Sequence, residues 1–287
     1  MTTVPDPPET PDKHIVDTLI EERAEKLVRS RLWPLYRAIL YPLLRYRAAV
    51  KMADAIQPLS AQAIFDYISD LLHIDVEAHG VENIPIQDRV LIAVTHPTGI
   101  SDGVAVFDAI KGHRPDMSFF ANRDAVRAAP GVADMIIPVE WVEEKRSPAR
   151  SRETLASTIE AFRSDKCIVL FPSGRIAAMQ DDKTLLEQPW LGSVAIFARK
   201  YNCPIVPAHI EARNSWLYYW FWKLNSELRD ITLFNELLNK RGQRYKITFG
   251  KLIDPTDLKG DANAVASALR EHAIGIESGA EWRPLEE

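Results

Sequence analysis

The chain has 287 residues, of which 46% are hydrophobic and 26% charged, and its formal net charge is −5. These fractions are ordinary for a globular protein and exclude a disordered or collagen-like chain. The length is sufficient for one large domain that buries its own core. The negative charge argues against nucleic acid as a partner, because duplex-binding proteins concentrate a basic excess.

The N-terminal residues 1–13 are acidic and rich in proline, and we expect them to form a disordered tail. They have neither the basic start nor the apolar run of a secretory signal. Because no stretch of about 18 uninterrupted apolar residues occurs, we expect no transmembrane helix. Cys167 and Cys203 each adjoin an apolar run and are interpreted as core thiols in a reducing compartment. These features predict a cytoplasmic protein.

Residues 14–75 are predicted to form a helical region at a membrane surface. Its first part, about 14–52, has a helical pattern that Pro34 and Pro42 divide into shorter pieces. Six basic residues in it are interleaved with leucine, tyrosine and tryptophan: Arg29, Arg31, Arg37, Arg45, Arg47 and Lys51. An amphipathic helical hairpin of this composition suits contact with anionic lipid. The alternative is a hairpin that packs on the rest of the protein, with its basic face in water.

From about residue 60, strand-like and helical patterns alternate. Apolar, strand-like runs lie at 76–81, 89–96, 117–121, 135–139, 166–171, 204–210 and 245–250. Helical patterns lie at 60–73, 103–111, 151–163, 191–200, 217–240 and 263–277. Several of the strands are continuously apolar, which is typical of a sheet covered on both faces. The predicted fold class is therefore α/β, with a mixed, mostly buried sheet flanked by helices and an N-terminal amphipathic helical hairpin.

The segment RVLIAVTHPTGISDG is the most informative one for function. A buried strand ends at Thr95, and the chain turns through His96 before a helix begins near Asp102. Ligands of α/β sheets bind beyond the carboxyl ends of the strands, which is where His96 lies. Asp102 can hold one imidazole nitrogen so that the other takes a proton from a hydroxyl. Asp102 can equally cap the helix without a catalytic part.

The segment CIVLFPSGR has the same layout, with an apolar strand, a tight turn and then Ser173, Gly174 and Arg175. Gly174 permits close backbone approach, and Arg175 offers a fork of donors for a phosphate or carboxylate. Taken alone, Arg175 is better interpreted as a surface arginine after a turn.

Together, these segments resemble the glycerolipid acyltransferase superfamily, whose type member acylates lysophosphatidate. Its N-H-x-S-x-x-D block is matched by residues 95–102, and Thr98 takes the position of the serine. The basic second block is matched by FFANRDAVRAAPG, with Arg123 near the usual lysine. The F-P-E-G-T-R-S block is matched by residues 171–177, and V-P-[IV]-x-P by residues 204–208. The resemblance covers about residues 76–255, so residues 76–287 are predicted to be the acyltransferase domain.

The resemblance implies that His96 deprotonates a lyso-lipid hydroxyl, which attacks the thioester of acyl-CoA or acyl carrier protein. No metal, cofactor or acyl-enzyme is implied; the implied partners are the inner membrane surface, the thioester donor and the lyso-lipid acceptor. The implied site consists of His96 and Asp102 for catalysis and, for substrate binding, of the following residues: Thr98, Arg123, Ser173, Gly174 and Arg175.

Three departures from the family pattern have consequences. Five residues, not four, separate His96 from Asp102, and Gly99 can absorb the extra one as a bulge. Ser173 replaces the family's glutamate, and Asn122 stands at the usual lysine. Both changes bear on the acceptor, so a lyso-aminolipid without a phosphomonoester is an alternative to lysophosphatidate.

Two further patterns have competing interpretations. The sequence GISDG matches the G-x-S-x-G elbow of serine hydrolases, which would make Ser101 the nucleophile. In that fold the strand runs straight into the elbow, whereas here three residues, His-Pro-Thr, intervene. The run Trp216–Trp222 is rich in aromatic residues. It is either a core-packing helix, or an interfacial anchor or part of an acyl-chain channel.

Overall fold

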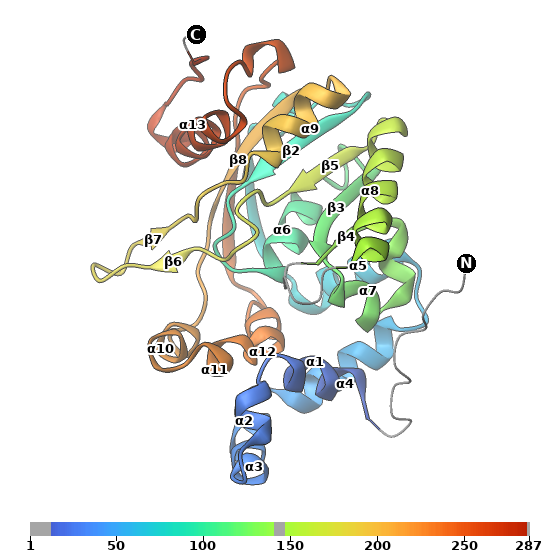
Figure 1. Cartoon of the computed structure of the whole chain (residues 1–287), viewed down its shortest axis with the longest axis vertical. Helices are drawn as coiled ribbons and strands as arrows, with labels where there is room; N and C mark the ends of the chain where they lie inside the picture. The colour runs from blue at the N-terminus through green and yellow to red at the C-terminus, as the bar shows by residue number, and fades with distance from the viewer. Residues whose placement is uncertain (1–12, 141–146, 286–287) are drawn as a thin grey trace.

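The computed structural model describes residues 13–140 and 147–285 (Figure 1). The predicted tail, apart from residue 13, lies outside the described residues. A seven-stranded sheet has the order β1-β9-β8-β2-β5-β3-β4. Its strands are β1 Asp75–His79, β2 Val90–Val94, β3 Met117–Asn122, β4 Ile136–Val139, β5 Cys167–Leu170, β8 Ile205–Glu211 and β9 Arg244–Phe249. A separate hairpin pairs β6 Ala178–Met179 with β7 Leu185–Leu186.

The sheet confirms the predicted fold class, because it is mixed, mostly parallel and flanked by helices. Each of the seven apolar runs forms one of its strands. The five strands β8, β2, β5, β3 and β4 run parallel to one another. Strand β9 is antiparallel to β8, and β1 is parallel to β9. The carboxyl ends of β2, β3 and β5 therefore share one edge of the sheet.

Both faces of the sheet are covered, as the continuous apolar strands predict. The side chains of Val90, Ile92 and Val94 belong to a core with α5 and α6, while Leu91 and Ala93 belong to a core with α8, α9 and α13. The buried thiols Cys167 and Cys203 lie one in each core, and burial raises the pKa of both to about 12. These helices are α5 Ala61–Leu72, α6 Ile100–Ile110, α8 Pro148–Arg163, α9 Ser193–Tyr201 and α13 Ala262–Gly275. Shorter helical turns are α7 Asp124–Ala128, η1 Val81–Asn83, η2 Pro130–Asp134, η4 Pro255–Asp257 and η5 Ile276–Ser278.

The N-terminal region forms four short helices instead of the predicted hairpin: α1 Ile15–Glu22, α2 Glu25–Arg29, α3 Trp33–Leu43 and α4 Tyr46–Ile56. Pro34 lies in the first turn of α3, where the backbone N–H that proline lacks would have no partner. Pro42 lies inside α3, one residue before its end, and so does not divide it. These helices share a third core with Val104 of α6 and Phe234 of α12 and thus pack on the sheet domain.

The helix predicted at 217–240 consists of three pieces: α10 Trp216–Leu224, α11 Ser226–Asp230 and α12 Leu233–Leu238. Asn225 separates the first two, because its backbone is extended and its side chain caps the amides of Glu227 and Leu228. In the described part of the chain, no helix is both long and apolar enough to cross a bilayer.

The contact between η2 and the segment before α5 depends on a glycine. A Cβ atom at Gly131 would lie 1.9 Å from the carbonyl oxygen of Leu59. We therefore expect Gly131→Ala to lower the free energy of unfolding by about 1–3 kcal/mol, as overpacking does. Gly112→Ala is the control, because nothing lies within 4 Å of its Cβ position. Urea denaturation of both variants tests the contact, and equal stabilities would contradict it.

Candidate active site

His96 lies in the loop that joins β2 to α6. Its side chain is 17% exposed and packs on Phe171, with 4.4 Å between the ring centroids. The imidazole Nδ1 lies 2.9 Å from Oδ2 of Asp102, as an ion-pair contact without the alignment of a hydrogen bond. The other nitrogen, Nε2, has no hydrogen-bond partner among the described residues. One imidazole nitrogen thus faces a carboxylate and the other is available to a substrate.

Asp102 occupies the third position of α6 and is fully buried. Its Oδ2 accepts hydrogen bonds from the amides of Thr98 and Gly99 at 2.9 and 3.0 Å, and Oδ1 accepts one from the Thr98 hydroxyl. Gly99 has φ +102° and ψ −130°, a conformation that side chains disfavour, so the loop has room for its extra residue there. Asp102 therefore both caps the helix and contacts His96.

Thr98 and Ser101 belong to a buried hydroxyl network with Tyr245. The three oxygen atoms lie 2.8–3.0 Å from one another. Ser101 is 1% exposed, and no histidine contacts its hydroxyl among the described residues. A nucleophile elbow instead presents its serine at the surface. This geometry argues against the serine-hydrolase interpretation.

The turn after β5 lies beside the His96 loop. The amide of Ala177 donates to the carbonyl oxygen of His96 at 2.8 Å, which joins the two segments. Ser173 is buried, and its hydroxyl donates to the carbonyl oxygen of Arg175 at 2.9 Å. Ser173 therefore shapes the turn. Gly174 and Arg175 line the main cavity together with Thr98.

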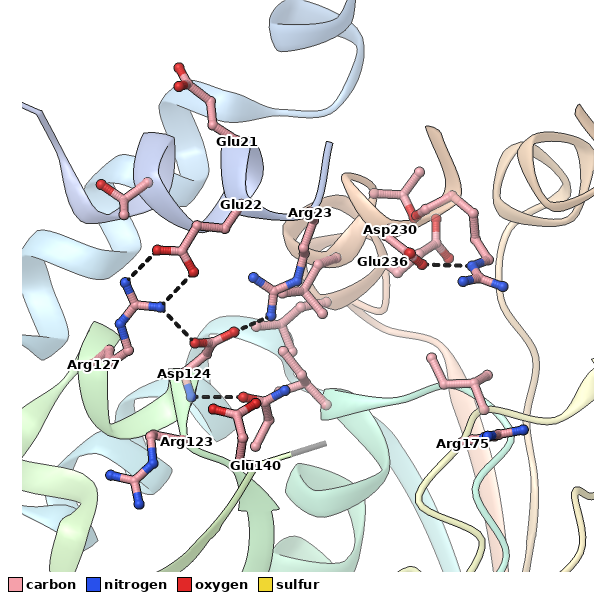
Figure 2. Close-up of a pocket in the computed structure, with 18 of the residues that line it drawn as sticks. Glu21, Glu22, Arg23, Arg123, Asp124, Arg127, Glu140, Arg175, Asp230 and Glu236 are labelled. Atoms are coloured by element: carbon pink, nitrogen blue, oxygen red, sulfur yellow. Dashed lines mark hydrogen bonds and ion pairs between the residues drawn. The ribbon is translucent and has the colours of Figure 1, made fainter. Parts of the chain in front are cut away.

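The main cavity has a volume of about 1460 Å³ and lies between this turn, the N-terminal helices and α10–α12. Figure 2 shows Arg175 on one side and Arg123 on the other. Arg123 pairs with Glu153 at 2.8 Å, and its Nε and Nη2 atoms are buried without a hydrogen-bond partner. The structure thus places the two predicted arginines in one cavity, but on opposite walls.

Most charges in this cavity are paired. Arg127 bonds to Glu22 and Asp124, and Asp124 also accepts a bond from Arg23 (Figure 2). Further cations of the described lining pair with carboxylates: Lys13 with Glu21, Arg29 with Glu25, Arg150 with Glu140 and Arg229 with Asp230. Within the described lining, Arg175 is the cation without a carboxylate inside 4 Å.

Glu187, directly after β7, is a site residue that the sequence analysis missed. Its carboxylate accepts a hydrogen bond from the backbone amide of His96 at 2.9 Å and is 5% exposed. The residue stands in a polar stretch without periodicity, so no local pattern marks it. Its contact with His96 spans 91 positions of the chain and is visible only in the fold.

Comparison with known proteins finds one family match, over just under half of the chain. Residues 75–211 match the model of the family described as Acyltransferase. A lyso-glycine lipid O-acyltransferase of Phocaeicola vulgatus is 25% identical over 64% of this chain and 66% of its own length, just under two thirds. A second of that name, from Bacteroides thetaiotaomicron, is 21% identical over 83% of this chain and 90% of its own.

Among solved structures, the 1-acyl-sn-glycerophosphate acyltransferase PlsC from Thermotoga maritima matches with a TM-score of 0.47 and 17% identity. The match covers 92% of this chain and 99% of that protein. The family match lies on the segment that carries the His96 loop and the turn after β5. Residues 75–211 therefore match the Acyltransferase family, and both curated relatives carry the name of an acyltransferase.

Proposed function

We propose that this chain is an O-acyltransferase that moves a fatty acyl group from acyl-CoA or acyl carrier protein to the hydroxyl of a lyso-lipid. The observation that carries the proposal is the pairing at His96, where Nδ1 faces the buried Asp102 and Nε2 is unoccupied. A carboxylate on one side of an imidazole orients it and stabilises the imidazolium that proton uptake creates. His96 is thus suited to act as general base.

In the proposed reaction, Nε2 of His96 takes the proton of the acceptor hydroxyl as its oxygen attacks the thioester carbonyl. The C–O bond forms, and the carbonyl oxygen carries a negative charge in the tetrahedral intermediate. The C–S bond then breaks, and the leaving thiolate takes the proton back from His96. The products are an ester and a free thiol, and no acyl-enzyme is formed.

We propose that the acceptor is a lyso-aminolipid of the lyso-glycine class and not lysophosphatidate. The names of the two relatives support this choice. The charges of the cavity support it as well, because Arg175 is the unpaired cation of the described lining. A phosphomonoester carries about 1.5–2 negative charges at pH 7. The single guanidinium of Arg175 therefore matches a headgroup with one negative charge better than it matches a phosphomonoester.

We also propose that the enzyme works at a lipid surface on the inner side of the membrane, through α3 and α10. Helix α3 exposes four large apolar side chains on one side: Leu32, Leu35, Ile39 and Leu43. Helix α10 exposes Trp216, Trp220 and Leu224, and the Trp216 side chain is 75% exposed. Tryptophan and leucine at this exposure, with Arg31 and Arg47 exposed nearby in the chain, suit the boundary of an anionic bilayer.

The test of the base is His96→Ala. Turnover should fall by about 10²–10⁴-fold, the usual contribution of general base catalysis. Ser101→Ala should retain most activity, because its hydroxyl is buried in a structural network. The assay follows thiol release from acyl-CoA or acyl carrier protein with a lyso-lipid acceptor. A fully active His96→Ala, or labelling of Ser101 by a fluorophosphonate, would refute the proposal.

The test of the acceptor is Arg175→Ala. Loss of a charge-assisted hydrogen bond of about 1.5–3 kcal/mol should raise KM for the acceptor tenfold or more. Arg175→Lys should recover only part, because an ammonium lacks the bidentate fork. The exposed Arg152 of α8 provides a control, Arg152→Ala, which should behave as wild type. Wild-type enzyme should prefer lyso-glycine lipid to lysophosphatidate, and the opposite preference would reject the acceptor class.

The test of lipid docking is sedimentation with vesicles of phosphatidylglycerol and phosphatidylcholine. Binding should rise with the anionic fraction and weaken with salt, because charges are screened beyond about 10 Å at 0.1 M. Trp216→Ser with Trp220→Ser should weaken binding at every salt concentration. Arg31→Glu with Arg47→Glu should weaken it mainly at low salt. If both pairs bind as wild type does, neither the tryptophans of α10 nor Arg31 and Arg47 contribute to lipid docking.

A further inference from the structure

Glu187 is a buried carboxylate that the proposed reaction does not use. Its Oε2 accepts the hydrogen bond from the His96 amide at 2.9 Å, and its Oε1 accepts one from Nε1 of Trp190 at 3.0 Å. The Ser173 hydroxyl also lies close enough to lower the pKa of Glu187, although its own hydrogen bond goes to Arg175. Glu187 thus connects the hairpin β6–β7 to both catalytic segments.

Burying this carboxylate opposes its ionisation. Burial raises the pKa of Glu187, and the hydrogen bonds from His96 and Trp190 oppose that rise. An ionised carboxylate removed from water costs free energy unless its hydrogen bonds compensate. A carboxylate in this setting beside a catalytic candidate points to a role in function.

The backbone of His96 is held from both sides. Glu187 accepts its amide hydrogen, and the amide of Ala177 donates to its carbonyl oxygen. Asp102 contacts the ring separately, at Nδ1. The peptide and the ring of His96 are therefore held by different carboxylates.

The backbone of Glu187 is hydrogen-bonded to helix α13. Arg270 donates to the carbonyl oxygens of Glu187 and Gln188. Gln188 lines the main cavity, whereas Glu187 lies beside a smaller cavity of about 360 Å³ with Trp190 and Arg270. Glu187 is therefore not part of the described lining of the main cavity.

We propose that Glu187 is a positioning residue that fixes the backbone of His96 for proton transfer. The inference rests on the proposed function of His96. In the family pattern that this chain resembles, a glutamate stands where Ser173 stands here. In this chain, Glu187, which follows β7, places a carboxylate beside the turn that contains Ser173. The family pattern does not contain this residue.

The first experiment is kinetic and uses Glu187→Gln. In the glutamine side chain an NH2 group replaces one of the two carboxylate oxygens, and this group cannot accept the hydrogen bond that the replaced oxygen received from the His96 amide or from Trp190. The kcat should fall by about 10–100-fold, the effect of misplacing a catalytic group by about 1 Å. The KM values for acceptor and thioester should stay within twofold of wild type. Asp182→Asn is the matched control, because it removes a carboxylate charge from the exposed tip of the same hairpin.

The second experiment does not depend on activity. Hydrogen exchange measured by mass spectrometry should be faster in Glu187→Gln than in wild type for the peptide that contains the His96 amide. Asp182→Asn should exchange as wild type does. If the wild type transfers no acyl group, the proposed function fails, while exchange at His96 still tests the contact with Glu187.

Other outcomes decide against the inference. Wild-type kcat in Glu187→Gln would overturn it, and so would a rise in KM with unchanged kcat, since Glu187 would then contact substrate. If Glu187→Gln does not fold, Arg270→Met is tested in its place. This substitution removes the hydrogen bonds from Arg270 to the carbonyl oxygen of Glu187, and Arg270 itself is partly exposed. That variant should show a smaller fall in kcat and faster exchange at His96. Wild-type values of both would overturn the inference.

Discussion

The burial of Asp102 is the constraint on which the His96 loop depends. A fully buried carboxylate must receive hydrogen bonds or a counter-charge, and here the partners are two amides, a hydroxyl and an imidazole. Three of these partners come from Thr98 and Gly99, so satisfying Asp102 defines the path of the chain from β2 to α6. His96 lies on that path, two residues before Thr98. The capping and catalytic interpretations of Asp102 are therefore compatible, because one arrangement serves both.

The direction of the strands explains how distant segments meet. Strands β2, β3 and β5 are parallel neighbours, so the residues that follow them reach the same edge. His96, Arg123 and the turn at 171–175 each follow one of these strands. Parallel strands require long crossover connections, and this is why the segments are far apart in sequence. Because the candidate site is assembled from several segments at this edge of the sheet, no single segment contains all of it. Each segment alone is therefore weak evidence of function.

The sequence predicted the strands and the loop between β2 and α6 because their signals are local. A continuously apolar run that ends in polar turn residues indicates a buried strand wherever it packs. The contacts of Glu187 and Arg123 were not predictable, because their partners lie elsewhere in the chain. The break at Asn225 had a local signal, since asparagine favours helix caps, but apolar periodicity outweighed it. At Pro42 the error was opposite, because proline was assigned more disruptive power than it has near a helix end.

Helix α10 shows why its aromatic sequence supported two interpretations. The side chains of Tyr218 and Trp222 line the main cavity, whereas Trp216 and Trp220 are exposed. Positions four apart share a face of a helix, so each pair occupies a face of its own. Trp222 also stacks with Arg229, one of the cavity's paired cations, at 4.6 Å. One helix therefore presents one aromatic face to the cavity and another to the exterior, which is why its sequence supported both interpretations.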